Sequence, residues 1–187
     1  MEYKQRCKWC NLKNDRYIEY HDKEWCTPNF DDKYLYEMLL LESFQAGLSW
    51  ECVLNKRENF RKAYADFELD KVICFDENKV SELLRNKGII RNKRKINASI
   101  DNSRIFKAIV DEFGSFHNYL RTFTNDTTIY ETGRTANALS DAISNDLQSR
   151  GMKFVGSVII YSYLQAIGVI YSHEEDCFLN KSRGVLQ

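Results

Sequence analysis

The chain has 187 residues, of which 43% are hydrophobic, and it includes 11 tyrosines and 11 phenylalanines. This content is enough for the core of one domain or of two closely packed lobes, and it excludes a disordered chain. Lysine plus arginine (27) balances aspartate plus glutamate (27), so no overall charge draws the chain toward nucleic acid, and any DNA affinity must come from a local patch.

Nothing in the sequence suggests secretion or a membrane. The first seven residues lack the apolar segment of a signal peptide. The longest apolar stretch, residues 155–170, includes polar residues and is too short to span a bilayer, so we expect a buried helix there. We therefore expect a cytoplasmic protein with no membrane partner. In that reducing compartment the six cysteines favour metal binding over disulfides.

The predicted secondary structure is helical. Apolar residues recur at helical spacing, and only one proline and eight glycines interrupt the pattern. Most expected helices begin at an aspartate, asparagine or serine, and several end at a glycine. In chain order they span residues 31–47, 50–60, 76–88, 92–113, 115–123, 140–150 and 157–167. Residues 125–134 are expected to form an irregular loop, and we find no alternating strands, so we predict an all-α fold.

Two short segments at opposite ends of the chain each carry one cysteine and one histidine. These are Cys7 with His21, and His173 with Cys177. Two thiolates and two imidazoles are the ligand set of a closed tetrahedral zinc site. If the segments meet, the metal joins the two ends of the chain. The spacing alone also allows unrelated buried thiols and surface imidazoles.

Positive charge concentrates in residues 85–95, which hold six cations and no anion. This run covers the end of one expected helix, a tight turn at Gly88-Ile89-Ile90 and the start of the next helix, as in a helix–hairpin–helix motif. Such a turn can direct backbone amides at a phosphate, and the cations add contacts without sequence preference. Arg91 stands where common motifs have a second glycine, so the match is partial. A solvated helix connection is the alternative.

Glu42 lies late in an apolar helix, between Leu41 and a turn that leads to Trp50. A carboxylate at this place either caps solvent-exposed surface or lines a cavity. The residue taken alone favours the surface position, because glutamate is rarely buried without a partner.

Several segments, in the same order, resemble those of DNA-3-methyladenine glycosylase I, the bacterial zinc-containing branch of the helix–hairpin–helix DNA glycosylases. The resemblance covers most of the chain, and several motifs in the family's order are far more specific than any single one. The matching segments are residues 6–9, 17–25, 45–50, 56–60, 88–91, 150–156 and 161–166, together with His173 and Cys177.

The resemblance implies a helix–hairpin–helix DNA glycosylase fold of two packed helical lobes within a single unit, residues 1–187. One lobe, about 30–125, would hold the hairpin, and the other, about 1–29 plus 126–187, would bind zinc. The implied activity is base-excision repair. The enzyme would flip 3-methyladenine out of alkylated double-stranded DNA and hydrolyse its N-glycosidic bond, which leaves an abasic site and releases 3-methyladenine. We expect a monomer.

The family's zinc ligands fall on Cys7, His21, His173 and Cys177. Four protein ligands leave no open position, so this zinc ion would hold the fold and take no part in the chemistry. Cys10 forms a C-x2-C pair with Cys7 that the family does not typically show, and it remains an alternative ligand.

The family's base-binding positions fall on Glu42, Tyr20 and Trp50. Glu42 would be the catalytic carboxylate that accepts hydrogen bonds from the base, while the two aromatic side chains stack on it. Three further aromatic residues are expected in the pocket wall, with plain aromatic core as the alternative: Trp9, Tyr17 and Trp25.

Gly47 and Leu48 match the family's wedge, which enters the gap left by a flipped nucleotide. Packing within a helix turn is the alternative for Leu48. The hairpin is expected to supply the remaining DNA contacts, which are Gly88, Ile89, Arg91, Lys93 and Lys95.

These residue types suit a cationic substrate. Methylation at N3 makes adenine a cationic leaving group, so the enzyme need not protonate it, and a desolvated carboxylate with aromatic faces favours it over neutral adenine. No lysine is assigned as a Schiff-base nucleophile, so we expect a monofunctional hydrolase without lyase activity. A catalytically silent DNA-binding module would have no use for Glu42 or the wedge. Ser43 and Phe44 depart from the small or polar residues typical of the family, and they are near enough to Glu42 in the sequence to alter the size of the pocket or which methylated purine fits.

Overall fold

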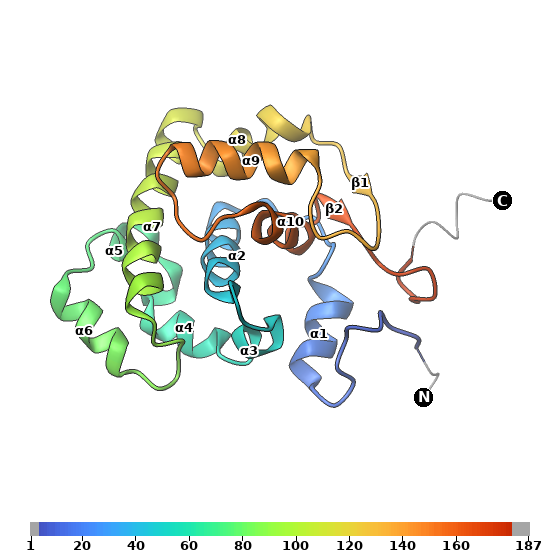
Figure 1. The fold of residues 1–187 in the computed structure, drawn as a ribbon, viewed down its shortest axis with the longest axis horizontal. Helices are drawn as coiled ribbons and strands as arrows, with labels where there is room; N and C mark the ends of the chain where they lie inside the picture. Colours follow the sequence, from blue (N-terminus) through green and yellow to red (C-terminus); the bar gives the residue numbers. More distant parts are fainter. Residues whose placement is uncertain (1–3, 181–187) are drawn as a thin grey trace.

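The computed structural model describes residues 4–180, and most of them are helical, as predicted (Figure 1). In chain order the elements are α1 (Asp15–Lys23), α2 (Asp32–Gln45), α3 (Trp50–Leu54), α4 (Arg57–Ala63), the 3-10 helix η1 (Ala65–Phe67), α5 (Leu69–Val72), α6 (Glu77–Arg85), α7 (Lys93–Phe113), α8 (Phe116–Thr124), β1 (Ile129–Tyr130), α9 (Ala138–Ser149), α10 (Ser157–Ala166) and β2 (Ile170–Tyr171). Within residues 4–180, no helix has both the length and the apolar character that crossing a membrane requires.

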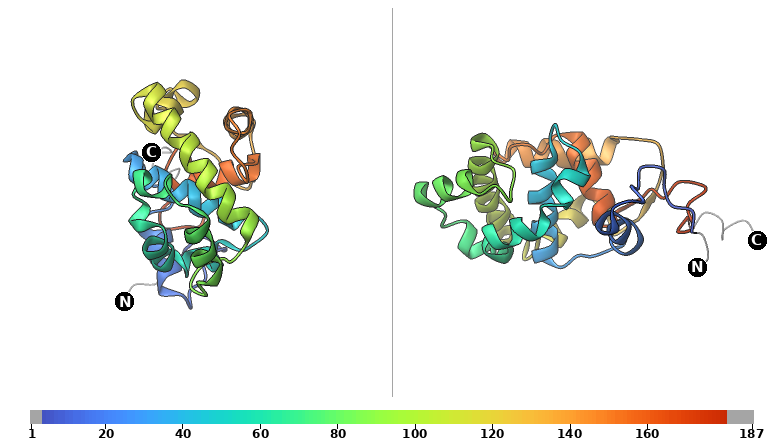
Figure 2. Two further views of the ribbon diagram at one scale, coloured as in Figure 1. Left: turned by 90° about the vertical axis from the view of Figure 1, so that its left-hand side faces the viewer. Right: turned by 90° about the horizontal axis from the view of Figure 1, so that it is seen from below.

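Helix α2 forms the centre of the molecule, because its residues 35–44 are all buried. It contacts α3, α7, α8 and α10, and Figure 1 shows it between α7 and α10. Helix α6 lies at one end of the longest axis, and both ends of the described chain lie at the other end, beyond α1 (Figures 1 and 2).

Several helix boundaries follow side-chain caps that the sequence indicates. Asp31, Asp76 and Asn92 each accept a hydrogen bond from the backbone amide three residues later, at the starts of α2, α6 and α7. Helix α7 ends at Gly114, whose φ of +81° lies in the left-handed region that glycine favours. These boundaries confirm the predicted positions.

The single helix expected over residues 50–60 is instead two helices, α3 and α4, separated around Asn55. The break lets α4 place the buried Arg57 against two carboxylates of other segments. Its Nε donates to Oε1 of Glu37 and its Nη1 donates to Oε2 of Glu24, both at 2.7 Å. The periodicity of the sequence could not indicate a bend that serves a distant ion pair.

Helix α1 was not predicted, because its buried face consists of Tyr17, Tyr20 and His21 rather than aliphatic residues. The expectation of a chain without strands is also wrong in one detail. Strands β1 and β2 pair in parallel, with Ile129 opposite Ile170. Two residues per strand are too few for an alternating pattern, yet this pairing holds the segment after β1 beside the segment after β2.

Candidate active site and metal cluster

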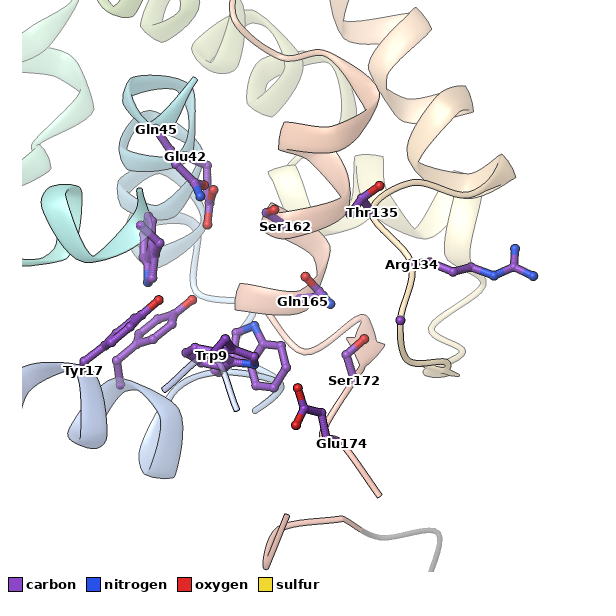
Figure 3. A pocket seen from close by; sticks show the side chains of 14 residues that line it. Trp9, Tyr17, Glu42, Gln45, Arg134, Thr135, Ser162, Gln165, Ser172 and Glu174 are labelled. Atoms are coloured by element: carbon purple, nitrogen blue, oxygen red, sulfur yellow. The ribbon is translucent and has the colours of Figure 1, made fainter. Parts of the chain in front are cut away.

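A pocket of about 440 Å³ lies among α1, α2, α3 and α10 (Figure 3). All six residues that were expected to bind the base line it, namely Trp9, Tyr17, Tyr20, Trp25, Glu42 and Trp50. The rest of the lining consists of Gln45, Gly133, Arg134, Thr135, Ser162, Gln165, Ser172 and Glu174. None of these eight was predicted as a site residue, and the five that lie outside the helices form no sequence pattern. Only Gln45, Ser162 and Gln165 carried a signal, since they lie inside segments that match the family.

Glu42 points into this pocket from the last turn of α2 (Figure 3). Only 2% of the residue is exposed, and within residues 4–180 its Oε2 has no hydrogen-bond partner. Burial raises the pKa of Glu42 well above its ordinary value. The surface position that the residue alone favoured is therefore wrong.

Two further buried atoms of the pocket residues also lack a partner among the residues that the structure describes: Oε1 of Gln45 and Nε1 of Trp50. Buried polar atoms in folded proteins are nearly always hydrogen-bonded, so these three are available to water or to a polar ligand in the pocket. The carboxylate and the amide can accept hydrogen bonds, and the indole can donate one.

Aromatic rings form the wall on either side of these polar atoms. Tyr20 and Trp50 have ring centroids 5.3 Å apart, at an interplanar angle of 49°, so the two rings pack against each other and form one aromatic surface of the pocket. Trp9 lies edge-on to Trp25 at 4.6 Å and tilted to Tyr17 at 5.3 Å. Burial raises the pKa of Tyr17 to about 12, which keeps its hydroxyl neutral and able to donate a hydrogen bond.

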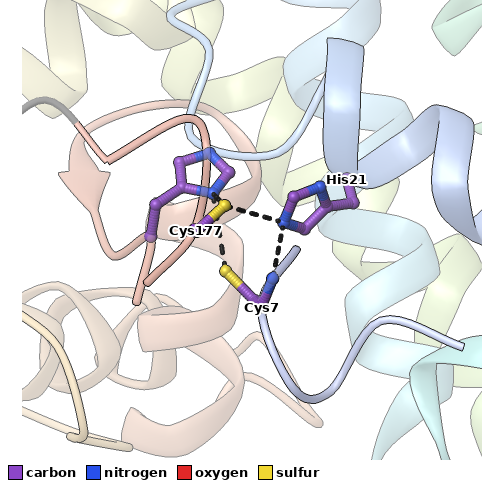
Figure 4. Close-up of side chains that lie close together, drawn as sticks. Cys7, His21 and Cys177 are labelled. Atoms are coloured by element: carbon purple, nitrogen blue, oxygen red, sulfur yellow. Dashed lines mark hydrogen bonds between the residues drawn. The ribbon is translucent and has the colours of Figure 1, made fainter. Parts of the chain in front are cut away.

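The four predicted metal ligands meet in one buried cluster, with their ligand atoms all within 4.8 Å of one another (Figure 4). Sγ of Cys177 lies 3.4 Å from Nδ1 of His173 and 3.5 Å from Nε2 of His21. Sγ of Cys7 lies 3.6 Å from Nδ1 of His173. A tetrahedral zinc ion, with bonds of about 2.3 Å to sulfur and about 2.0 Å to nitrogen, separates such atoms by about 3.5 Å. The cluster therefore fits zinc in both donor set and size.

The surroundings of the cluster orient one of its imidazoles. Nδ1 of His21 lies 2.8 Å from Oδ1 of Asp22, and Arg6 holds that carboxylate through Nε and Nη2. A carboxylate on one ring nitrogen leaves the other nitrogen free to bind metal. Cys10 lies outside the cluster, with its thiol 3.8 Å from the carbonyl of Tyr17, so it does not replace Cys7.

The pocket wall rests directly on this cluster. The ring of Trp25 stands edge-on to His173 at 4.8 Å, and the ring of Trp9 is 5.3 Å from His21. These two indoles therefore line the pocket and also pack around the cluster. The sequence allowed either pocket wall or aromatic core for them, and in the structure they are both.

The turn between α2 and α3 presents the residues expected to form a wedge. Gly47 has a φ of +76°, a conformation that side chains disfavour. The next residue, Leu48, is 42% exposed, so it does not pack within the turn as the alternative required. Ser49 caps α3 and so places Trp50 in the pocket.

The cationic run joins α6 to α7. Arg85, Lys87, Arg91, Lys93 and Arg94 are exposed, and none of the five forms an ion pair with another residue of the described chain. Their charge is thus available to a partner, and an anionic surface is the natural one.

Two residues of the hairpin shape the turn instead of facing outward. The amide of Gly88 donates to Oδ1 of Asn86 at 2.8 Å, and the amide of Ile89 donates to the carbonyl of Asn86 at 3.4 Å. Ile89 is 2% exposed, and a Cβ at Gly88 would lie 3.0 Å from Cβ of Asn59. Direct DNA contact by Gly88 and Ile89 is therefore not supported, because their amides are already bonded inside the turn.

The prediction that Lys95 contacts DNA is wrong. Lys95 is 7% exposed, and its Nζ donates to the carbonyl of Phe44 at 2.8 Å and to that of Ala46 at 2.5 Å. The helix turn after Lys93 carries this side chain inward, so the ammonium reaches the end of α2 and not the solvent.

Ser43 and Phe44 do not line the pocket, contrary to expectation. The hydroxyl of Ser43 donates to the carbonyl of Leu40. The ring of Phe44 is fully buried and lies 4.8 Å from that of Phe60. They follow Glu42 on the helix but point to other faces of it, because successive residues are rotated by about 100°.

Comparison with known proteins identifies the family of this chain. A model of the methyladenine glycosylase family matches residues 9–180. DNA-3-methyladenine glycosylase 1 of Escherichia coli is 42% identical over 180 residues, which cover 92% of this chain and 95% of that protein. A crystal structure of 3-methyladenine DNA glycosylase I superposes with a TM-score of 0.90 at 39% identity, covering 94% of this chain and all of that one. A single-residue variant of such an enzyme, solved in complex with 3-methyladenine, superposes with a TM-score of 0.85 at 31% identity, over 89% and 93% of the two chains. This chain belongs to the methyladenine glycosylase family.

Proposed function

We propose that this chain is a monofunctional DNA glycosylase that excises 3-methyladenine from alkylated double-stranded DNA, acting as a monomer in the cytoplasm. The reaction hydrolyses the N-glycosidic bond and leaves an abasic site, which begins base-excision repair. The observation that carries the proposal is the buried Oε2 of Glu42, which has no hydrogen-bond partner in the described part of the chain and lies in an aromatic-walled pocket. Membership of the methyladenine glycosylase family supports the same substrate.

A buried carboxylate without a partner is costly in an empty pocket, and a cationic base offsets that cost. In DNA, 3-methyladenine carries a positive charge that unmodified adenine lacks. Glu42 accepts hydrogen bonds from this base, and such bonds between charged groups are worth about 1.5–3 kcal/mol each. The rings of Tyr20 and Trp50 add a cation–π contribution of about 0.5–2 kcal/mol. Both contributions are smaller for the neutral base, so the pocket discriminates by charge.

The same charge means that the reaction needs no dedicated acid. Breaking the N-glycosidic bond releases the methylated base as a neutral molecule, so the leaving group needs no proton from the enzyme. The protein must hold the flipped nucleotide and stabilise the cationic state in which the bond breaks.

A lyase mechanism requires an amine beside the sugar. Among the described residues that line the pocket there is no lysine, and the one cation is Arg134. Because a guanidinium stays protonated, it cannot serve as the Schiff-base nucleophile. Hydrolysis without a covalent intermediate is the reaction that fits.

Two surface features serve DNA binding in this proposal. The exposed Leu48, on the turn at Gly47, enters the gap left by the flipped nucleotide. Exposed cations of the α6–α7 connection, among them Arg91 and Lys93, contact the phosphate backbone as a helix–hairpin–helix motif, and Gly88 allows the tight turn between them. Such contacts give affinity without sequence preference, as a repair enzyme requires.

We further propose that zinc occupies the cluster of Cys7, His21, His173 and Cys177. Bound there, zinc supplies no chemistry, because four protein ligands leave no position for water or substrate. The cluster joins the first and last described segments behind Trp9 and Trp25, and so supports the pocket wall. This arrangement favours two lobes, a hairpin lobe of about residues 30–125 and a zinc lobe of about 1–29 plus 126–187.

A base-release assay tests the proposal. Duplex DNA treated with a methylating agent is incubated with the protein, and the free bases are separated by chromatography. We expect 3-methyladenine to be released, and no covalent protein–DNA adduct after borohydride reduction. An unmethylated duplex is the control. DNA binding without base release would contradict the enzymatic function, and a trapped adduct would contradict the hydrolytic mechanism.

A further inference from the structure

One buried cation takes no direct part in the proposed reaction. Lys95 lies in the first turn of α7, yet its ammonium ends at the last turn of α2. It donates to the carbonyls of Phe44 and Ala46, at 2.8 and 2.5 Å. Carbonyls at a helix C-terminus lack partners within the helix, and a cation there also interacts favourably with the helix dipole. Lys95 therefore closes the end of α2 from a different helix.

The segment that Lys95 fixes carries the groups that act on the base. Glu42 lies about one turn before Ala46 on the same helix, and Leu48 lies two residues after it. The amide of Leu48 donates to the carbonyl of Gln45 at 2.6 Å, so three successive backbone groups at this turn are held. The direction of the wedge relative to the carboxylate depends on that turn.

The other end of the Lys95 side chain starts from the hairpin. Arg91, Lys93 and Arg94, three of the exposed cations, lie within the four residues before it. A phosphate bound by these cations fixes the start of α7. Because the stem of Lys95 runs from that start to the end of α2, this one side chain joins the DNA-binding hairpin to the wedge.

We propose that Lys95 is a positioning residue, which couples the hairpin's hold on the DNA backbone to the placement of Leu48 in the duplex. The inference rests on the proposed glycosylase function. It assigns Lys95 no contact with DNA or with the base, because its ammonium is already bonded within the protein. The lysine acts through the carbonyls of Phe44 and Ala46.

The test compares Lys95→Met with two matched lysine variants of α7. Methionine keeps the length and removes the donor. Under single-turnover conditions at saturating enzyme, we expect Lys95→Met to release 3-methyladenine up to about tenfold more slowly, because a residue that acts through the wedge cannot cost more than the loss of the wedge itself. Its DNA affinity should keep the wild-type dependence on salt. Lys93→Met should lower the slope of log K against log salt by about 0.9, the value for one lost phosphate contact in duplex DNA. Lys107→Met, which loses only an exposed pair with Asp111, should change neither measure.

A double-mutant cycle with Leu48→Ala separates positioning from general loss of stability. If Lys95 acts through the wedge, Lys95→Met should slow release much less in the Leu48→Ala background than in the wild type. Equal slowing in both backgrounds would overturn the proposal. So would a wild-type release rate in Lys95→Met, or a salt slope reduced as in Lys93→Met.

Two controls distinguish a loss of the positioning role from a folding defect and from a lack of glycosylase activity. If Lys95→Met does not fold, Lys95→Gln, whose shorter amide cannot reach both carbonyls, is judged by the same three measures. If the wild-type protein itself releases no 3-methyladenine, the proposed function fails. If it does and both Lys95 variants match it, only the positioning role fails.

Discussion

Replacing Glu42 with glutamine should make the protein more stable at neutral pH, although Glu42 belongs to the active site. Burial raises the pKa of this carboxyl in the folded state, and its Oε2 has no partner within residues 4–180. The folded state therefore holds the proton more tightly than the unfolded state. Above the unfolded pKa of about 4.3, the free energy of unfolding falls with rising pH, until the folded carboxyl also ionises.

The size of the effect follows from the separation of the two pKa values. Each unit of separation costs about 1.4 kcal/mol of folding free energy once both states are ionised. For a domain of this length, that corresponds to roughly 3–6 °C in Tm per unit. Glutamine has nearly the same shape and no charge, so Glu42→Gln removes this loss.

Thermal unfolding of the two proteins from pH 4 to pH 8 is the assay. The plots of Tm against pH for the two proteins should meet near pH 4 and separate as pH rises, with the higher Tm in the glutamine variant. Glu19→Gln, at an exposed site on α1, serves as the control and should stay close to the wild type throughout. A constant difference between wild type and Glu42→Gln, or a variant that is less stable at pH 8, would refute the reasoning about the unpaired carboxylate.

Three more outcomes are expected. Removing zinc with a chelator, or by Cys177→Ser, should lower Tm by about 8–16 °C, because a ligand at a thousand times its Kd contributes about 4 kcal/mol. Metal analysis should show that Cys10→Ser keeps the metal. If Cys10→Ser loses as much metal as Cys177→Ser, the proposed ligand set is wrong. Leu48→Ala should slow base release from duplex DNA about tenfold. It should change the free energy of unfolding by less than about 0.5 kcal/mol, because the side chain is half exposed. An unchanged rate of base release in single-turnover kinetics would rule out the wedge. Trp50→Ala should weaken binding of free 3-methyladenine by about 1–3 kcal/mol, the usual contribution of stacking one base on an aromatic ring, and calorimetry that finds equal affinity would show that Trp50 does not stack on the base.

The sequence predicted the parts of the fold that depend on local signals. Capping residues such as Asp31, Asp76 and Asn92 marked where helices begin, and Gly114 marked where α7 ends, because these residues satisfy backbone groups in their own neighbourhood. The break at Asn55 escaped prediction, because it depends on an ion pair between segments far apart in the chain.

The candidate site was predictable where a resemblance to a family placed its residues. The residue type alone favoured a surface position for Glu42, because glutamate is rarely buried without a partner, and only the matching motifs indicated a pocket. The same resemblance could not show that Lys95 turns inward, because a run of charges does not say which side of a helix faces the protein. Pocket residues from loops, such as Thr135 and Glu174, carried no signal at all, because the pairing of β1 with β2 that brings their segments together is only two residues long.

The most direct test of the charge-selective pocket is the single-turnover rate of 3-methyladenine release by Glu42→Gln on methylated duplex DNA. The variant keeps a hydrogen bond but loses the Coulomb attraction to the cationic base, which is up to about 4 kcal/mol for charges about 4 Å apart at an effective dielectric constant of about 20. We expect a rate at least about 100-fold below that of the wild type, with Glu19→Gln unaffected. A folded Glu42→Gln protein that releases the base within about threefold of the wild-type rate would contradict the account.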